Sequence, residues 1–334
     1  MSSNPDLTLF HYTFSPFAKR VVWYLNLRGI KYNQCLQPPI MPRPDLAALG
    51  VQYRRIPVLA IGRDLYCDSR LILQKLEERF PDGALGATDN DGKALEKLLE
   101  VWTTDVVFGR AAQLIPSDTP LTSDPKFIED RRDFFNTPNQ EKYGALQRRP
   151  EATLHVKQAF HFLETTLLAD GRTWIRKTDK PSLADIHASW VLDWVIGLKG
   201  AADPDQISER HFPKVFAWVQ RFREVLNASR AHTPKPRTVT GAEVLASLAS
   251  AGYGEPEGLL DETDPLKLRK GQEVVVWPTD SGSSYRDRGS LVALNRNEVV
   301  LQRKTANGQF DVRIHFPRIN FRIIATEDAS RSKI

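Results

Sequence analysis

Cysteine is scarce in this chain of 334 residues, which contains only two. Cys35 and Cys67 lie too far apart for a CxxC motif or a metal-ligand spacing, so the sequence predicts free thiols, no metal site and an intracellular protein. Long apolar runs are missing as well, because no stretch approaches the roughly 18 residues that span a bilayer. We therefore expect no membrane-spanning segment.

Clusters of positive charge are also missing, although the formal net charge is +5. The 46 lysines and arginines are scattered among 41 acidic residues and are not interleaved with aromatic residues. A nucleic-acid-binding surface would concentrate its basic residues on one face or in one segment. The sequence therefore predicts a mixed, solvated surface and no nucleic-acid partner.

The two ends of the chain provide only weak indications of location. The N-terminal segment lacks a basic region followed by an apolar stretch, which argues against a secretory signal and favours the cytoplasm. The C-terminal Ser332-Lys333-Ile334 differs from the peroxisomal S-K-L address only in its last residue. Peroxisomal import is therefore the minor alternative.

What is present is an ordinary globular composition, with 41% hydrophobic and 26% charged residues. The length is sufficient for two or three domains that each bury a core. Local patterns divide the chain into a mixed α/β part, a helical part, a linker and a β part. The predicted boundaries are 1–83, 90–232, 233–264 and 265–334.

The first part is predicted to form strand, helix and strand, followed by a hairpin and a second helix. Ser15 before Pro16 is typical of a helix N-cap followed by proline in the first turn, and Gly29 is typical of the residue that ends a helix. Asp68 and Ser69 open the second helix. The expected strands are 7–10, 31–36, 57–61 and 65–67. This order is the thioredoxin-like plan.

Helical spacing continues from about 91 to 230. One long helix is expected over 91–115, and another begins at Ser182, because Asp185 three residues later completes a capping box. A short helix over 242–251 interrupts the linker. Five short strands separated by turns then indicate a small barrel-like β domain: 273–277, 289–294, 298–303, 311–316 and 320–324.

Three motifs of the first part, in this order and spacing, resemble the glutathione S-transferase family. They are Thr13 to Arg20, Arg55 to Leu59 and Tyr66 to Ile72. The resemblance covers the first 230 residues and implies an α/β thioredoxin-like domain followed by an all-α domain. The segments 271–274 and 312–318 resemble a C-terminal β module of certain fungal transferase-like proteins.

The resemblance implies a site for glutathione, a tripeptide with two carboxylates and one thiol. Ser69 and its free N–H at a helix N-terminus would hold the γ-glutamyl carboxylate, with Asp68 beside them. Ile56, turned outward by a cis bond to Pro57, would pair with the cysteinyl backbone like an added strand. Either Arg55 or Arg54 would meet the glycyl carboxylate, unless these arginines face solvent. The implied site also includes Phe17. The alternatives are a plain N-cap at Asp68-Ser69 and a trans proline.

Ser15 would stand where the thiol of glutathione lies. Only about 3% of a free thiol with a pKa near 8.5 is thiolate at neutral pH. A hydroxyl hydrogen bond and the dipole of the first helix would lower this pKa by roughly two units. Tyr12 is the rival for this role, and the alternative for Ser15 is a plain helix cap. Because this segment contains no cysteine, dithiol exchange is not expected there.

An electrophilic substrate would bind between the first two domains. Its expected contacts are Phe14, Trp102, Asp105, Phe108 and Gln113, although aromatic residues on a long helix are usually core residues.

The resulting hypothesis is a glutathione transferase that adds the thiolate to a small hydrophobic electrophile such as an epoxide, an activated alkene or a quinone. Isomerisation or elimination of a bound substrate would use the same thiolate, and the β module points to fungal secondary metabolism. The alternative is a binding or scaffold protein that kept the fold and lost catalysis. The family resemblance also implies a homodimer.

Overall fold

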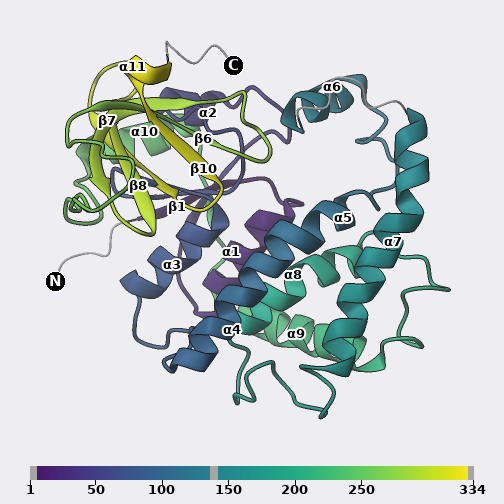
Figure 1. Cartoon of the computed structure of the whole chain (residues 1–334). Coiled ribbons are helices and arrows are strands. Elements are labelled where there is room, and N and C mark those ends of the chain that lie inside the picture. Colours follow the sequence, from purple (N-terminus) through teal and green to yellow (C-terminus); the bar gives the residue numbers. More distant parts are fainter. Residues whose placement is uncertain (1–5, 136–141, 330–334) are drawn as a thin grey trace.

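A computed structural model describes residues 6–135 and 142–329, and side chains are described outside 142–147 and 328–329. Figure 1 shows the strands gathered at one end of the molecule and most of the helices at the other. The strands in chain order are β1 Leu7–His11, β2 Asn33–Leu36, β3 Val58–Ile61, β4 Asp64–Cys67, β5 Arg237–Thr238, β6 Glu273–Pro278, β7 Asp287–Leu294, β8 Glu298–Lys304, β9 Asp311–Pro317 and β10 Phe321–Ala325.

Except for the short α11 in the β part, the helices fall in the three regions of the chain where helices were expected. In chain order they are α1 Pro16–Leu27, α2 Pro44–Ala48, α3 Ser69–Arg79, α4 Asn90–Val101, the π-helix η1 Trp102–Val107, α5 Phe108–Ala112, α6 Pro125–Phe134, α7 Lys142–Thr165, α8 Leu183–Gly197, α9 Pro213–His232, α10 Gly241–Ser250 and α11 Thr326–Ala329. None of these described helices combines the length and the apolar character needed to cross a bilayer.

The first part of the chain has the predicted thioredoxin-like plan. Strand β1 pairs in parallel with β2 and antiparallel with β3, and β3 continues through a tight hairpin into β4. Helices α1 and α3 pack against each other and against the helical region, and all three share one apolar core. Trp23 of α1 and Phe222 of α9 meet in this core with ring centroids 5.1 Å apart. The α/β and all-α predictions are therefore confirmed.

The long helix expected over 91–115 is wrong in one respect. The chain is helical from Asn90 to Ala112, but the six residues of η1 form a π-helix between α4 and α5. Thr103 is fully buried, and its hydroxyl donates to the carbonyl of His187 at 2.8 Å and to that of Leu99 at 2.8 Å. Such widened turns are typical of functional regions of helices, and periodicity alone does not reveal them.

The C-terminal β-rich region is confirmed, with all five predicted strands present. It forms no separate sheet, because β9 pairs in parallel with β4 and continues the thioredoxin-like sheet. The order across this sheet is β10-β6-β7-β8-β9-β4-β3-β1-β2-β5. Val58 and Leu65 share an apolar core with Ile314 and Phe316. An added partner at β4 covers what would otherwise be an open sheet edge.

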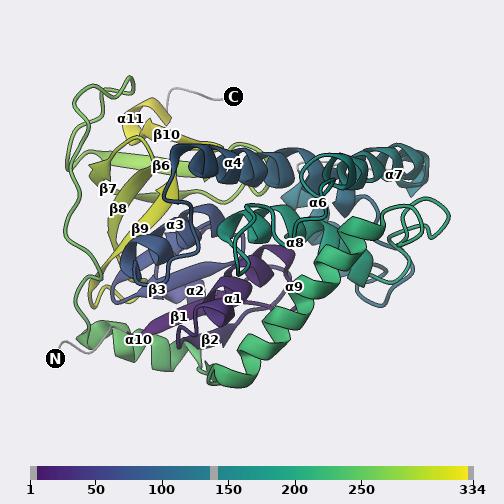
Figure 2. The ribbon, with the colours of Figure 1, turned by 90° about the horizontal axis from the view of Figure 1, so that it is seen from below.

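The expected linker over 233–264 packs closely on the first part of the chain. Its β5 pairs with β2, α10 contacts α2, and Tyr253 bridges to Gly62. Figure 2 shows α10 at the margin of the sheet, following directly from α9. The segment packs because its apolar residues Val244 and Leu248 are buried in the same core as the C-terminal strands.

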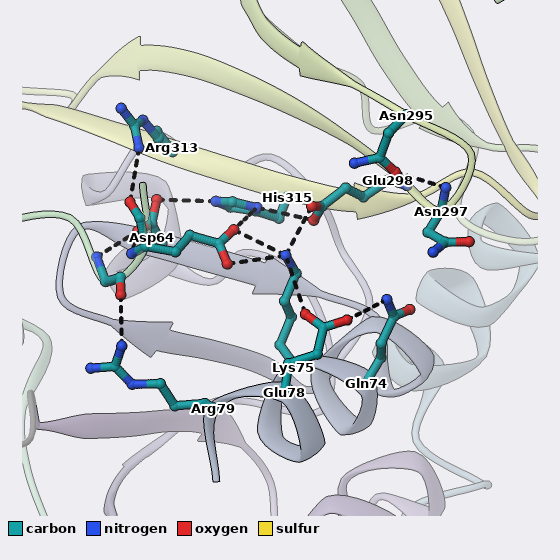
Figure 3. A network of polar contacts seen from close by, with 12 residues as sticks. Asp64, Gln74, Lys75, Glu78, Arg79, Asn295, Asn297, Glu298, Arg313 and His315 are labelled. Atoms are coloured by element: carbon teal, nitrogen blue, oxygen red, sulfur yellow. Dashed lines mark hydrogen bonds and ion pairs between the residues drawn. The ribbon is translucent and has the colours of Figure 1, made fainter. Parts of the chain in front are cut away.

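A buried polar cluster joins the C-terminal strands to α3 and β4 (Figure 3). The ring of His315 on β9 contacts the Asp64 carboxylate at 3.0 Å and the Glu298 carboxylate at 3.3 Å. The Lys75 ammonium of α3 lies 2.8 Å from Glu298 and 3.0 Å from Glu255. Charged groups from five segments therefore meet where the sheet is extended.

Candidate functional site

The register of the sheet brings three of the sequence motifs to one edge. Phe10 near the end of β1 pairs with Val58 at the start of β3, and Val58 pairs with Cys67 at the end of β4. The segments that follow Phe10, precede Val58 and follow Cys67 therefore emerge side by side. These segments carry Ser15, the Ile56-Pro57 bond and the Asp68-Ser69 pair.

Ser15 is the N-cap of α1, as predicted. Its Oγ accepts from the backbone N–H of Ala18 at 3.3 Å, and its own N–H donates to the carbonyl of Tyr12 at 3.0 Å. Pro16 occupies the first turn of the helix. Ser15 is only 2% exposed. An oxygen that accepts at a cap still carries a proton, so its O–H remains available as a donor.

The bond between Ile56 and Pro57 is cis, as the resemblance implied. Ile56 is buried and stands just outside the strand ladder, whose first pair is Val58 with Cys67. A second cis bond joins Met41 to Pro42. The backbone of Ile56 is therefore placed next to the sheet but not in it, as β-addition of an extended peptide requires.

The Asp68-Ser69 pair begins α3. Asp68 has a left-handed φ of 73°, and its side chain accepts from the N–H of Arg70 at 3.0 Å. A residue other than glycine in that conformation costs of order 1–3 kcal/mol and is common at ligand-binding positions. Ser69 follows in the first turn, where backbone N–H groups have no partner in the helix.

A buried arginine that the sequence did not single out lies beneath Ser69. Arg20 of α1 is fully buried, and its guanidinium donates to the Ser69 hydroxyl at 3.3 Å and to that of Thr104 at 3.2 Å. It also contacts Nδ1 of His187 at 2.9 Å. Burial lowers the pKa of Arg20 to about 10, which leaves it charged at neutral pH. The sequence feature that could have revealed Arg20 is a cation on the inner face of an otherwise apolar helix.

Asp105 of η1 pairs with Arg70, a residue of the first turn of α3. The Arg70 guanidinium pairs with Glu100 at 2.6 Å and with Asp105, and Asp105 also accepts from the side-chain amide of Asn320 at 2.9 Å. Asn320 belongs to the turn between β9 and β10. The sequence assigned Asp105 to an electrophile site, and the structure ties it to α3 and to the C-terminal region.

The two arginines before Ile56 have different surroundings. Arg54 is buried, pairs with Asp130 at 2.7 Å and with Asp133, and carries the ring of Phe134 on its guanidinium. Its side chain is only 2% exposed. Arg55 also has acidic partners, Asp280 and, at 4.0 Å, Asp68, but its side chain is 15% exposed. Of the two candidates for a ligand carboxylate, the geometry favours Arg55, because it is the one that solvent reaches.

The predicted electrophile contacts divide into separate groups. The ring of Phe108 packs on Phe17 with centroids 4.5 Å apart, and both contact Trp190. Phe14 is 54% exposed and packs only 4.7 Å from the ring of Tyr12. The remaining two lie elsewhere, because Trp102 packs on Phe162 of α7 and Gln113 is exposed at the end of α5.

Both cysteines are free and buried. Burial raises the pKa of the Cys35 thiol to about 12 and holds that of Cys67 well above its ordinary value. Neither thiol is therefore poised as a nucleophile or a redox centre at neutral pH.

Three side chains could be considered as metal ligands in the described part of the chain. Glu255, Glu298 and His315 each offer one ligand atom, and these atoms lie within 4.8 Å of one another. The ammonium of Lys75 contacts both carboxylates, so a cation of the protein itself already balances their charge.

Comparison with known proteins agrees with this geometry. Residues 9–84 match the glutathione S-transferase N-terminal domain, and residues 110–231 match a domain of unknown function, DUF7962. A probable glutathione S-transferase of Solanum tuberosum is 27% identical over 100 residues, which are 30% of this chain and 46% of the relative. Glutathione S-transferase U1 of Arabidopsis thaliana is 22% identical over 211 residues, 63% of this chain and 81% of the relative.

A solved structure has the same fold over nearly the whole chain, including the C-terminal strands. It is a GST-like protein from Pseudomonas syringae with 24% identity and a TM-score of 0.66, covering 96% of this chain and 99% of its own. In the potato relative, by contrast, the matched segment is less than half of the protein. Residues 9–84 therefore form a glutathione S-transferase N-terminal domain, and nearly the whole chain has the fold of a GST-like protein.

Proposed function

We propose that this protein binds glutathione at the sheet edge where Ser15, Ile56-Pro57 and Asp68-Ser69 meet and transfers its thiolate to a small electrophile. The observation that carries the proposal is the register Phe10–Val58–Cys67, which sets these three motifs side by side. Ser69 and the first N–H groups of α3 receive the γ-glutamyl carboxylate, and the buried Arg20 charge stabilises it from below. The backbone of Ile56 pairs with the cysteinyl residue, and Arg55 meets the glycyl carboxylate.

The role of Ser15 is to stabilise the thiolate by donating its O–H to the sulfur. Together with the N-terminus of α1, this hydrogen bond lowers the thiol pKa by roughly two units and raises the thiolate fraction about 25-fold at neutral pH. The sulfur then forms a bond to an electrophilic carbon, and the electron pair of the opened bond collects a proton from water or a side chain. Tyr12 is the second candidate, because it lies three residues before Ser15 and is half-buried.

Ser15→Ala tests this role. We expect the second-order rate constant for a reactive electrophile to fall several-fold at pH 7, by less than the full factor of about 25, and the apparent thiol pKa to move up toward 8.5, because the hydroxyl donor is gone while the N-terminus of α1 remains. Glutathione affinity, measured by calorimetry, should change little. Ser15→Thr retains a hydroxyl and should keep most of the activity, and Tyr12→Phe should behave like the wild type.

Two results would contradict the proposal in different ways. An unchanged pH–rate profile in Ser15→Ala, with Tyr12→Phe inactive, would transfer the role to Tyr12. Absence of glutathione binding to the wild-type chain in calorimetry would remove the transferase function altogether.

The substrate side of the site is proposed to take a small hydrophobic electrophile. Phe14 and Tyr12 offer an exposed aromatic surface beside Ser15, and the remaining candidates are Trp102, Asp105, Phe108 and Gln113. Conjugation, isomerisation and elimination all begin with the same thiolate. A role in secondary metabolism is part of this proposal, and a panel of epoxides, enones and quinones would identify the substrate class.

The second candidate function is a glutathione-binding or scaffold protein without catalysis. One observation favours it: the C-terminal region contacts the site, through Asn320 at Asp105 and through Asp280 at Arg55. If the wild type converts an electrophile faster than the uncatalysed reaction, and Ser15→Ala reduces that rate, the protein is an enzyme and not only a binding protein.

A homodimer is proposed from an exposed apolar strip on the helical region. Trp102 contacts Phe162 across η1 and α7, and Leu98, Val106, Leu154 and Phe162 are all exposed. Light scattering should give about twice the 37.9 kDa chain mass. The double change Leu98→Glu and Phe162→Glu should give a monomer, whereas a wild-type monomer would exclude this strip as an interface.

The cytoplasmic location also remains a proposal. Ser332-Lys333-Ile334, on which the peroxisomal alternative depends, lies outside the described residues. A fluorescent protein fused at the N-terminus, with and without these three residues, would distinguish the two compartments.

A further inference from the structure

The loop between β6 and β7 reaches from the C-terminal region to the arginines before Ile56. Asp280 pairs with the guanidinium of Arg55, and the carbonyl of Ser281 accepts from Arg55 Nε at 3.0 Å. On its other side Arg55 lies 4.0 Å from Asp68. A residue remote in the sequence thus supplies a carboxylate to the arginine that the proposed function assigns to the glycyl carboxylate of glutathione.

The rest of this loop, residues 279–286, is firmly anchored. The N–H of Gly282 donates to the carbonyl of Phe134 in α6 at 2.7 Å. Gly282 has a φ of +73°, and a Cβ there would lie 2.9 Å from Cγ of Arg54. The guanidinium of Arg54 lies between the rings of Phe134 and Tyr285, 5.1 Å from each centroid. The loop therefore keeps its position independently of the Asp280 contact.

Asp280 is the accessible member of this arrangement. Its side chain is 53% exposed, whereas that of Arg55 is 15% exposed. A half-exposed carboxylate can leave its partner and be solvated again at small cost, because pairs of this kind contribute little net free energy. Arg55, held by Ser281 and facing Asp68, stays in place.

We propose that Asp280 occupies the ligand-carboxylate position on Arg55 in the free protein and that binding of glutathione displaces it. This inference rests on the proposed function. A bound glycyl carboxylate would be the third carboxylate around one guanidinium, beside those of Asp68 and Asp280. Repulsion among them favours release of Asp280, the one that water can reach. The loop of the C-terminal region thereby sets the affinity for the tripeptide.

Calorimetric titration of Asp280→Asn with glutathione tests the displacement. Because the asparagine amide competes weakly for Arg55, the dissociation constant should decrease about three- to fivefold. γ-Glutamylcysteine lacks the glycyl carboxylate, so its affinity should be the same for the variant and the wild type. Asp311→Asn, the same change in the same β-rich region at a carboxylate 3.9 Å from Lys304, should alter neither ligand's affinity. Asp280→Ala should repeat the gain of Asp280→Asn.

Each other result overturns the inference. Weaker glutathione binding in both Asp280 variants would mean that Asp280 contacts the ligand directly, and unchanged binding would mean that it does not compete. An equal gain for both peptides would place the competition away from the glycyl end. If neither peptide binds even to the wild type, the proposed function fails together with this inference, whereas in the first three cases the proposed function stands.

Discussion

Asp185→Ala is expected to lower the free energy of unfolding by about 4 kcal/mol. The carboxylate is completely buried at the start of α8, where it accepts from the N–H of Ser182 at 2.8 Å and from that of Ile175 at 2.9 Å. It also accepts from the indole N–H of Trp218 at 3.0 Å. Alanine would leave these buried donors without an acceptor and leave a cavity among them.

Asp193 on the same helix provides the matched control. It is equally buried, but its partners Lys19 and Arg223, both at 2.6 Å, have partly exposed side chains. These cations can return to water, so Asp193→Ala should cost only about 1 kcal/mol. Equal losses for Asp185→Ala and Asp193→Ala in thermal or urea denaturation would contradict this explanation.

Asparagine at position 185 removes the charge and keeps one of the two acceptor oxygens, since Oδ1 accepts from Ile175 and Trp218 and Oδ2 accepts from Ser182. Burial raises the pKa of the Asp185 carboxyl, against the hydrogen bonds from Ile175, Ser182 and Trp218. The charge itself is therefore unfavourable at this position, but the asparagine NH2 group cannot accept from the donors at one of the two oxygens. Asp185→Asn should therefore cost less than Asp185→Ala while remaining destabilising. A loss as large as that of the alanine variant would show that one acceptor oxygen is not enough.

Local patterns predicted the elements of this fold well. The caps at Ser15, Asp68 and Ser182 depend on residues at most three positions away, so the sequence contains all the information that decides them. The five C-terminal strands were equally readable, because alternation and turns are local as well. The π-helix at Trp102–Val107 was not readable, since the widened turn depends on the contact of Thr103 with α8.

The assembly of the elements could not be read in the same way. The pairing of β9 with β4 joins Arg313 to Asp64, which are far apart in the chain, and edge pairing depends on shape and register rather than on composition. Nor does the sequence distinguish Arg54, which is enclosed by acidic residues of α6, from its neighbour Arg55. Only the tertiary contacts separate them.

The candidate site likewise contains residues that local motifs predict and residues that only tertiary contacts reveal. Ser15, Pro57 and Ser69 belong to short motifs, and these motifs were found. Arg20 and Asp280 were not found as site residues, because each has an ordinary local interpretation, the first as a helix residue and the second as part of a turn. Their significance comes from Ser69 and Arg55, which they contact from other segments.

The second large effect is expected at His315, and it depends on pH. Burial opposes protonation of this imidazole, but its contacts with Asp64 and Glu298 outweigh burial and raise the pKa above 6.5. Burial likewise opposes ionisation of Glu298, yet His315 and Lys75 lower its pKa to about 2. The Glu298 carboxylate therefore stays charged at neutral pH, and the His315 imidazole keeps its proton to a higher pH than a free imidazole does.

The sign of the effect follows from proton linkage. A base whose pKa is higher in the folded state than in the unfolded state stabilises the fold fully below the unfolded value of about 6.5. This contribution decreases as the pH rises through the folded pKa. Each unit by which the pKa is raised corresponds to about 1.4 kcal/mol.

His315→Gln should therefore lose about 3 kcal/mol at pH 6, because Asp64 and Glu298 lose a buried positive partner. The difference between wild type and variant should decrease as the pH rises through the folded pKa, above 6.5, as measured by thermal or urea denaturation at matched ionic strength. His187→Gln is the control of opposite sign. Burial and the nearby Arg20 hold the pKa of His187 well below 6.5, so His187 destabilises the fold as the pH falls. The stability of His187→Gln relative to the wild type should therefore improve toward acid pH. Parallel stability curves for His315→Gln and the wild type would show that the cluster binds no proton at His315.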